Sequence, residues 1–292
     1  MNFHIAGADI TSHSIELTGE ELTREEFRNT VFLTDFGCVR ISGSDSLKFL
    51  NGLSTSDLKK LADQSGSPAL LLNSEGKFFV LVYVFRLQED LLVFAPSAKL
   101  EIFLQYLDFY HIRENTNFQI MEGPRLLVSH SSSELPQVLT EGNILDGPGS
   151  SESGENPLLM GKKITGQVSL DHFRYFLDFF DQSLDLRQGY PHHLGLRKYV
   201  SFTKGCFIGQ EPVARMEHKT LIRKTLSVFY STSDLNPGEE FSDESAKATL
   251  LSVNRGKVGG FRAALAEVRY LSENLSHGVL KSHDGKKIET NY

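Results

Sequence analysis

The sequence predicts an α+β protein that ends in a small β-barrel, and three observations lead to this fold class. Between residues 39 and 110, the hydrophobic pattern indicates a strand, a helix, hairpin-connected strands and a second helix, an order typical of an α+β layer. Beyond residue 220, short strand-like runs alternate with turn residues, which favours a small barrel or sandwich. Neither GxGxxG nor GxxxxGK[ST] occurs, so nothing in the sequence indicates a parallel nucleotide-binding sheet.

The first elements are a short strand and a short helix. The run VRI at 39–41 is typical of a strand, and SDSLKFLNGL at 44–53 of a helix. Ser44 is expected to cap this helix, because a serine hydroxyl can accept a hydrogen bond from the amides of the first turn. Gly52 is expected to end it, because glycine adopts the left-handed conformation that stops many helices.

The next elements are antiparallel strands followed by an amphipathic helix. Strands are expected at 69–72, 78–86 and 91–95, because turn residues separate these apolar runs. A helix is expected over 97–110, where apolar residues recur at the spacing i, i+3, i+4 and i+7 and so share one face of a helix. These residues are Leu100, Phe103, Leu104 and Leu107.

Composition divides the chain into three parts. Residues 146–157, DGPGSSESGENP, are rich in Gly, Ser and Pro and are expected to form a flexible loop within an α+β region, 1–200. Residues 201–222 hold a cysteine motif at the junction with a β-barrel, 223–292. In the barrel, strands are expected at KTLSVFYS, ATLLSV, AALAEVRYL and GVLKSH, and Asp284-Gly285 predicts a hairpin turn.

Whole-chain properties exclude several classes. With 40% hydrophobic and 23% charged residues, the chain is typical of a soluble globular protein with two or three cores. The apolar run at 78–85 is too short to cross a membrane and no signal peptide is recognised, so a cytoplasmic location is expected. A net charge of -7 argues against broad nucleic-acid binding through the whole surface, and no direct sequence-specific binding is expected. A local basic patch near the motif is an open alternative, but its residues are interpreted as a solvated strand entry: Arg215, His218, Lys219, Arg223 and Lys224.

The cysteine motif TKGCFIGQEPVARM, 203–216, is the strongest candidate for chemistry. A thiolate is the reactive form of cysteine, and the neighbouring Lys204 can favour it at Cys206, as can backbone amides of a tight turn. Pro212 suits the first turn of a short helix formed by PVARM, residues 212–216, at the end of the motif. The alternative is that Cys206 is a small buried hydrophobic residue, the commoner role of a single cysteine. The only other cysteine, Cys38, lies in an apolar context and is interpreted as core.

Other candidate sites have weaker support. Two cysteines cannot form a disulfide framework or hold an iron–sulfur cluster with four ligands from this chain. His192 and His193 together with His172 or His218 lack the spacing of known metal motifs, so no metal site is predicted. Acidic residues such as Asp35, Glu75 and Asp108 are interpreted as solvated surface.

The motif resembles the signature K-G-C-[FY]-x-G-Q-E-x-V-A-R of the YgfZ family of folate-binding proteins, a branch of the glycine-cleavage T-protein (aminomethyltransferase) superfamily. The lead-in YVSF and the blocks VRISGSDSLKFLNGLSTSDLKKL and LLLNSEGKF are also similar to this family. The residues that match the signature are Lys204, Gly205, Cys206, Phe207, Gly209, Gln210, Glu211, Val213, Ala214 and Arg215.

The resemblance implies a fold, a ligand and a role. It implies an aminomethyltransferase-like fold with ferredoxin-like α+β domains and a barrel around a tetrahydrofolate site. It also implies assembly or repair of iron–sulfur clusters in client enzymes, including enzymes that modify tRNA, through Cys206 and Lys204. The residues implied in folate binding are Phe36, Gln210, Glu211 and Arg215.

Two further functions stay open on the sequence. A tetrahydrofolate-dependent aminomethyltransferase would need a carboxylate in the segment LRQG, where Arg187 and Gln188 stand instead. A folate-binding scaffold without chemistry would need no reactive thiol. Whether the protein is an enzyme is therefore left undecided by the residues alone.

Overall fold

The computed structural model describes residues 3–5, 8–10, 21–28, 30–122, 124–129, 137–140, 143–145, 163–165, 167–180, 188–219, 222–271 and 278–290. Contacts divide the chain into two compact units. The first contains Met1–Ile15, Asn29–Gln167 and Tyr199–Gln210, and the second contains Glu16–Arg28, Val168–Lys198 and Glu211–Tyr292. The loop expected at 146–157 lies outside the described residues, and the boundaries expected at 200 and 222 stay predictions.

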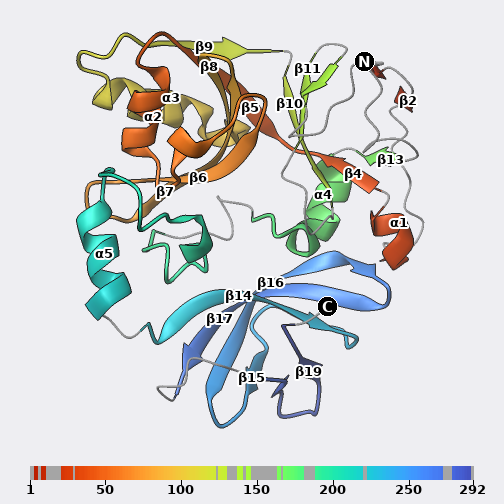
Figure 1. The fold of residues 1–292 in the computed structure, drawn as a ribbon. Coiled ribbons are helices and arrows are strands. Elements are labelled where there is room, and N and C mark those ends of the chain that lie inside the picture. The colour runs from red at the N-terminus through yellow and green to blue at the C-terminus, as the bar shows by residue number, and fades with distance from the viewer. Residues whose placement is uncertain are drawn as a thin grey trace. The chain divides into compact units, whose positions relative to one another are not determined.

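The first unit is built on a five-stranded antiparallel sheet with two helices beside it (Figure 1). The helices are α2 (Ser46–Leu53) and α3 (Leu100–Tyr110), with the 3-10 turns η1 (Leu58–Lys60) and η2 (Ser97–Lys99). The strands, in sheet order, are β6 (Gly66–Leu72), β7 (Phe78–Leu87), β8 (Asp90–Pro96), β5 (Phe36–Ser42) and β9 (Asn117–Met121).

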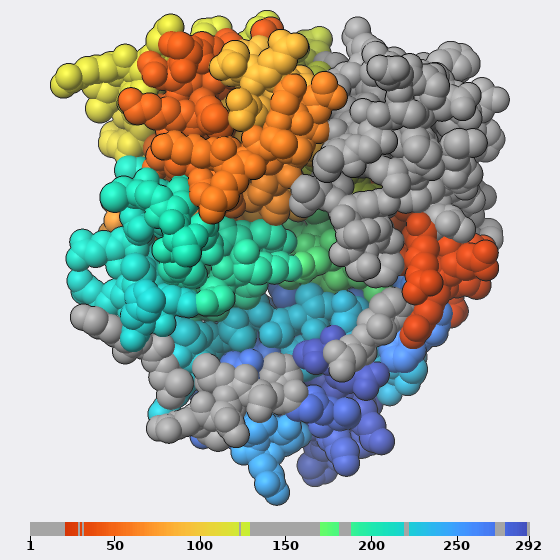
Figure 2. Space-filling model, in the orientation of Figure 1, coloured from red at the N-terminus to blue at the C-terminus, as the bar shows by residue number. Residues whose placement is uncertain are grey.

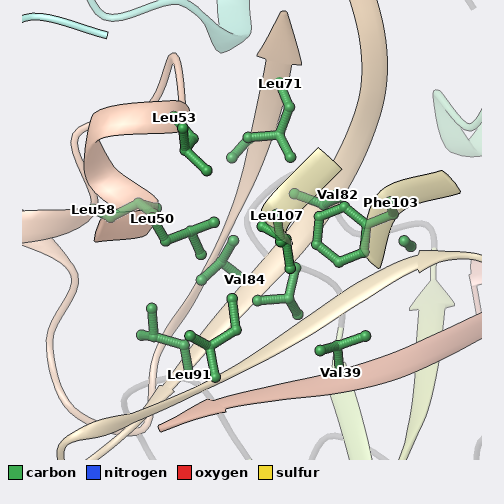
Figure 3. Packing of buried hydrophobic residues seen from close by; sticks show 14 of the residues in the cluster. Val39, Leu50, Leu53, Leu58, Leu71, Val82, Val84, Leu91, Phe103 and Leu107 are labelled. Atoms are coloured by element: carbon green, nitrogen blue, oxygen red, sulfur yellow. The ribbon is translucent and has the colours of Figure 1, made fainter. Parts of the chain in front are cut away.

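The core of this unit lies between the helices and one face of the sheet. Leu50 and Leu53 of α2 and Leu107 of α3 pack with Val82 and Val84 of β7 (Figure 3). Burial of these branched side chains is the main force that holds the helices on the sheet, at about 1.5–3 kcal/mol for each side chain.

The amphipathic pattern expected at 97–110 is confirmed by this core. Phe103 and Leu107 are fully buried, and Leu100 and Leu104 pack at the edge of the cluster. The strands expected at 39–41, 69–72, 78–86 and 91–95 are also present, within β5, β6, β7 and β8.

The remaining described strands of the first unit form two further sheets, one of five strands and one of two. One has the order β12 (Asn143–Leu145), β11 (Gln137–Thr140), β10 (Arg125–Ser129), β4 (Thr30–Leu33) and β13 (Lys163–Thr165). The other pairs β1 (Phe3–Ile5) with β2 (Ala8–Ile10).

The second unit contains a nearly closed β-barrel, as the sequence predicts. Hydrogen bonds between the backbones of Tyr230 and Glu289 join the first and last strands of the sheet. Strand β3 (Glu21–Leu22) pairs with β16 outside this ring. The ring has the order β14 (Lys224–Ser231), β17 (Phe261–Tyr270), β16 (Ala246–Val258), β15 (Glu240–Ser242), β18 (Leu280–Lys281) and β19 (Lys287–Ile288).

Helices accompany the barrel in the same unit. Phe27 of α1 (Arg24–Arg28) has its ring centroid 5.7 Å from that of Phe173, which ends α4 (Gln167–Phe173). The 3-10 turns are η3 (Arg174–Leu177) and η4 (Arg197–Tyr199), and α5 (Gln210–Lys219) begins within the cysteine motif. No helix among the described residues is long and apolar enough to cross a membrane.

Local signals gave a mixed outcome at turns and helix ends. The hairpin at Asp284-Gly285 is confirmed, because Gly285 has a φ of 86° and joins the antiparallel strands β18 and β19. The cap expected at Ser44 is wrong, since Asp45 precedes α2 and the Ser44 hydroxyl accepts a hydrogen bond from the Asn115 amide. The stop expected at Gly52 is also wrong, since the helix continues to Leu53.

Candidate functional site

The cysteine segment, Tyr199–Gln210, belongs to the first unit and is held there by Thr55 at its start. The Thr55 hydroxyl donates a hydrogen bond to the Tyr199 carbonyl oxygen at 2.7 Å and accepts one from the Leu70 amide at 3.2 Å. The Ser201 amide in turn donates to the Thr55 carbonyl oxygen at 2.9 Å. A fully buried threonine therefore joins the lead-in of the motif to the sheet.

Lys204 provides the second attachment, at the C-terminal end of α2. Its ammonium donates hydrogen bonds to three carbonyl oxygens: Asn51 at 2.6 Å, Ser56 at 3.1 Å, and Ser54. A helix leaves its last carbonyls without partners inside the helix, so a cation at this end satisfies them. The ammonium of Lys204 has three N–H donors, which equals the number of carbonyl oxygens that accept from it.

Burial determines how this lysine titrates. Lys204 is only 8% exposed, and burial lowers the pKa of its ammonium to about 8. The carboxylate of Asp57 opposes this shift in pKa, and the ammonium of Lys59 adds to it. The charge at Lys204 is thus directed into the end of α2, and its hydrogen-bond donors are occupied there.

The third attachment follows the cysteine and ends in a turn. The Ile208 amide donates to the Gly52 carbonyl oxygen at 3.1 Å, and Ile208 packs against the core of the sheet and helices. Gly209 has a φ of 75°, and a Cβ there would lie 2.4 Å from the Asn73 carbonyl oxygen. The glycine is required because the motif passes so close to the turn that joins β6 and β7.

Cys206 lies between these attachments and faces solvent. Gly205 before it is exposed and has open space around its Cα, whereas Phe207 after it is buried. Residues around this segment, coloured teal, reach the surface in Figure 2. The site therefore presents an accessible thiol on a loop whose two ends are bound to the same unit, and the alternative of a buried, space-filling Cys206 is wrong.

Cys38 has the opposite environment. It lies buried in β5, and burial raises the pKa of its thiol to about 12, with Arg125 opposing the rise. This confirms its interpretation as core. Cys206 is thus the accessible thiol of the two.

Phe36, implied in folate binding, lies at the start of β5 in the first unit. Its side chain is 6% exposed, and its ring centroid lies 5.9 Å from that of Tyr83 with the planes inclined by 62°. Burial raises the pKa of Tyr83, so this tyrosine stays neutral at physiological pH. A stacked pterin needs an open ring face, and the ring of Phe36 offers little exposed surface for one.

The other residues implied in folate binding lie on or at the start of α5. Gln210 begins the helix and is half-buried. Glu211 and Arg215 form an exposed ion pair of 3.1 Å at the spacing i, i+4 within the second unit. Such a pair contributes only a few tenths of a kcal/mol. Gln188 is exposed and carries no carboxylate, and Arg187 lies outside the described residues.

One cluster was not identified from the sequence. Buried His192 contacts Glu217 with 2.9 Å between Nε2 and Oε2, and Arg197 holds the same carboxylate with two nitrogens. Hydrogen bonding from Arg197 is the main reason that the pKa of Glu217 falls to about 2, and His192 adds to this. Glu217 lies 20 residues beyond Arg197 and 25 beyond His192, too far in the sequence for a spacing rule to connect it with them.

No metal site accompanies this cluster. Among the residues that the structure describes, no three His, Cys, Asp or Glu side chains are grouped to hold a metal ion. Asp35, Glu75 and Asp108 are exposed, which confirms their interpretation as solvated surface.

Comparisons with known proteins agree with the resemblance seen in the motif. No family model matches the chain. The chain is 26% identical over 265 residues to the tRNA-modifying protein YgfZ of Colwellia psychrerythraea, with 79% of each protein covered. It is also 26% identical over 270 residues to the mitochondrial iron–sulfur cluster assembly factor IBA57 of Homo sapiens, covering 79% of this chain and 73% of that protein. The expected similarity to YgfZ is therefore confirmed.

The fold has a counterpart among solved structures. The glycine cleavage system aminomethyltransferase T from Bartonella henselae superposes with a TM-score of 0.65 over 93% of this chain and 90% of that chain. The two are 14% identical, so the likeness concerns the fold alone. The expected aminomethyltransferase-like fold is confirmed.

Proposed function

We propose that this protein assists the assembly or repair of iron–sulfur clusters in client enzymes, including enzymes that modify tRNA, and that it acts through Cys206. The similarity to YgfZ and IBA57 supports the biological role, because those relatives are a tRNA-modifying protein and a cluster assembly factor. The observation that carries the proposal is the exposed thiol of Cys206 on a loop attached at Thr55, α2 and the Asn73 turn.

The number of thiols limits what the protein does in this role. The second cysteine, Cys38, is buried, so this chain supplies one accessible thiol. A cluster is commonly held by four cysteine thiolates, so the remaining ligands must come from the client or from small thiols. Cys206 would then bind the cluster, or one of its irons, as a single ligand during transfer to or protection of the client.

A complementation experiment tests this role. In cells that lack the gene, we expect Cys206→Ser to fail to restore the activity of iron–sulfur enzymes and the tRNA modifications that depend on them. Thr203→Ser is the matched control, because Thr203 lies on the same loop and is also exposed. Full activity with Cys206→Ser, at equal protein level, would contradict the proposal and favour a scaffold without chemistry.

Tetrahydrofolate is the ligand that we propose for the protein. The motif resemblance and the aminomethyltransferase fold support it, whereas the covered ring of Phe36 does not offer a stacking surface. We therefore assign no chemical step to folate. Anaerobic calorimetry should show saturable binding with Kd of about 1 μM, near -8 kcal/mol, to both the wild type and Cys206→Ser. No binding to either would remove folate from the proposal and leave the thiol role in place.

The aminomethyltransferase alternative has less support. Such an enzyme stabilises positive charge on the reacting folate with a carboxylate, and Gln188 in the corresponding segment carries none.

A cytoplasmic location also stays a prediction, because the relatives named IBA57 are mitochondrial proteins.

A further inference from the structure

The ammonium of Lys204 and the amide of Ile208 are bound to neighbouring carbonyls of one helix end. Lys204 donates a hydrogen bond to the Asn51 oxygen and Ile208 donates one to the Gly52 oxygen, and both oxygens lie in the last turn of α2. These carbonyls carry the negative end of the helix dipole, which favours a cation in this position. Only residues 205–207, with Cys206 at their centre, separate the two attachments.

The chemistry of the site suits lysine in particular. Three oxygens from Asn51, Ser54 and Ser56 converge on one nitrogen, and a compact ammonium has three donors that rotate to meet them. The planar guanidinium of arginine directs its donors in a fixed fork and does not match three converging acceptors. The Lys204 nitrogen also lies 5.3 Å from the ring centroid of Phe207, which joins the lysine to the residue after the cysteine.

These contacts leave the lysine without a donor for the thiol. Each N–H of Lys204 has a carbonyl partner, and the side chain is buried while Cys206 is exposed. In the motif, the cation of Lys204 is thus close to Cys206 in sequence, but its hydrogen bonds go to the backbone of another segment.

We propose that Lys204 is a positioning residue that fastens the Cys206 loop to the end of α2, and that it takes no part in proton transfer at the thiol. This inference rests on the proposed function of Cys206 and deepens it. Without the ammonium, the carbonyls of Asn51, Ser54 and Ser56 lose a shared partner, and the loop between Thr203 and Ile208 opens more often.

Hydrogen exchange on the full-length protein tests the proposal. In Lys204→Met, we expect the Ile208 amide to exchange about tenfold faster or more, the factor that corresponds to loss of about 1.4 kcal/mol. Lys48→Met is the matched control, because Lys48 is an exposed lysine on the same helix, and exchange at Ile208 should not change. If Lys204→Met does not fold, Lys204→Gln, which retains an amide donor, is measured in its place with the same expectation.

A second readout separates positioning from a direct role at the thiol. We expect the pH profile of Cys206 alkylation by iodoacetamide to keep its midpoint in Lys204→Met. A shifted midpoint, or unchanged exchange at Ile208 in a folded variant, would overturn the proposal. Neither readout depends on clusters or folate, so a failure of the cellular role of Cys206 would be recognised separately, by the Cys206→Ser complementation.

Discussion

The amide of Ile208 donates a hydrogen bond to the carbonyl oxygen of Gly52, 3.1 Å away, and so joins the cysteine loop to the last turn of α2. The sequence blocks that resemble the YgfZ family are therefore in contact: one supplies a helix end with free carbonyls, and the other supplies the donors. The cysteine loop and the helix end therefore form one structural element.

Gly209→Ala should destabilise the protein, whereas Gly205→Ala should not. Gly209 has a φ of 75°, and an added Cβ would lie 2.4 Å from the Asn73 oxygen and 2.8 Å from the Gly76 Cα. We expect a loss of about 2 kcal/mol or more in the free energy of unfolding, measured in urea. Gly205 has no atom within 4 Å of its added Cβ, so its variant should stay within about 0.5 kcal/mol of wild type. Equal losses would contradict the close approach at Gly209.

Thr55→Val should loosen the lead-in of the motif. The change keeps the shape of the side chain but removes the hydroxyl that the Leu70 amide and the Tyr199 carbonyl share, so that the carbonyl keeps only the Ser56 hydroxyl at 3.3 Å. Because Thr55 is fully buried, we expect the free energy of unfolding to fall by about 1–3 kcal/mol. Thr203→Val, at an exposed position of the same segment, should change it by less than about 0.5 kcal/mol. A Thr55 variant as stable as this control would show that the hydroxyl contributes little.

The two cysteines should differ strongly toward alkylating reagents. Burial raises the pKa of Cys38 to about 12, so this thiol stays protonated at pH 8. We expect iodoacetamide to label Cys206 alone in the folded protein and both cysteines in denaturant, as peptide mass spectrometry would show. Comparable labelling of Cys38 in native buffer would mean that β5 opens readily.

The His192, Arg197 and Glu217 cluster should stabilise the second unit in a pH-dependent way. The pKa of Glu217 lies near 2, below the ordinary value of 4.5, so the stabilisation is complete above about pH 4.5 and is lost as pH falls toward 2. Glu217→Gln should therefore lower the free energy of unfolding most at neutral pH. The shift in pKa corresponds to an upper limit of about 3 kcal/mol. The loss should be smaller than this limit, because Arg197 is largely exposed and solvent screens its charge.

The control for Glu217 is another glutamate of the same helix. Glu211 pairs with Arg215 in an exposed position, so Glu211→Gln should have little effect on the free energy of unfolding at any pH. The stability curves of wild type and Glu217→Gln, measured by urea unfolding, should converge between about pH 4.5 and pH 2. Curves that stay parallel over this range would show that Glu217 does not carry the pH dependence.

Helix ends show where sequence reasoning failed. Ser44 and Gly52 have the residue types of a cap and a stop, yet α2 has no side-chain cap and extends past Gly52 to Leu53. Its final carbonyls have partners from a distant segment, Lys204 and Ile208, so the helix end depends on contacts that a local pattern does not contain. The cluster around Glu217 was missed for the same reason, since Glu217 lies on α5, 20 residues beyond Arg197 and 25 beyond His192.

The sequence by itself determined the strands β5 to β8, β14 and β16 to β18, the buried face of α3, the hairpin at Asp284-Gly285 and the choice of Cys206 as the residue of interest. These features depend on side-chain periodicity, on the conformational freedom of glycine and on a short motif, and each of these is contained in a few consecutive residues. Only the tertiary structure decided that Cys206 is exposed and that the neighbouring charge of Lys204 binds carbonyl oxygens of α2. The physical reason is that a buried cation must find acceptors, and packing between distant segments determines which acceptors lie within reach.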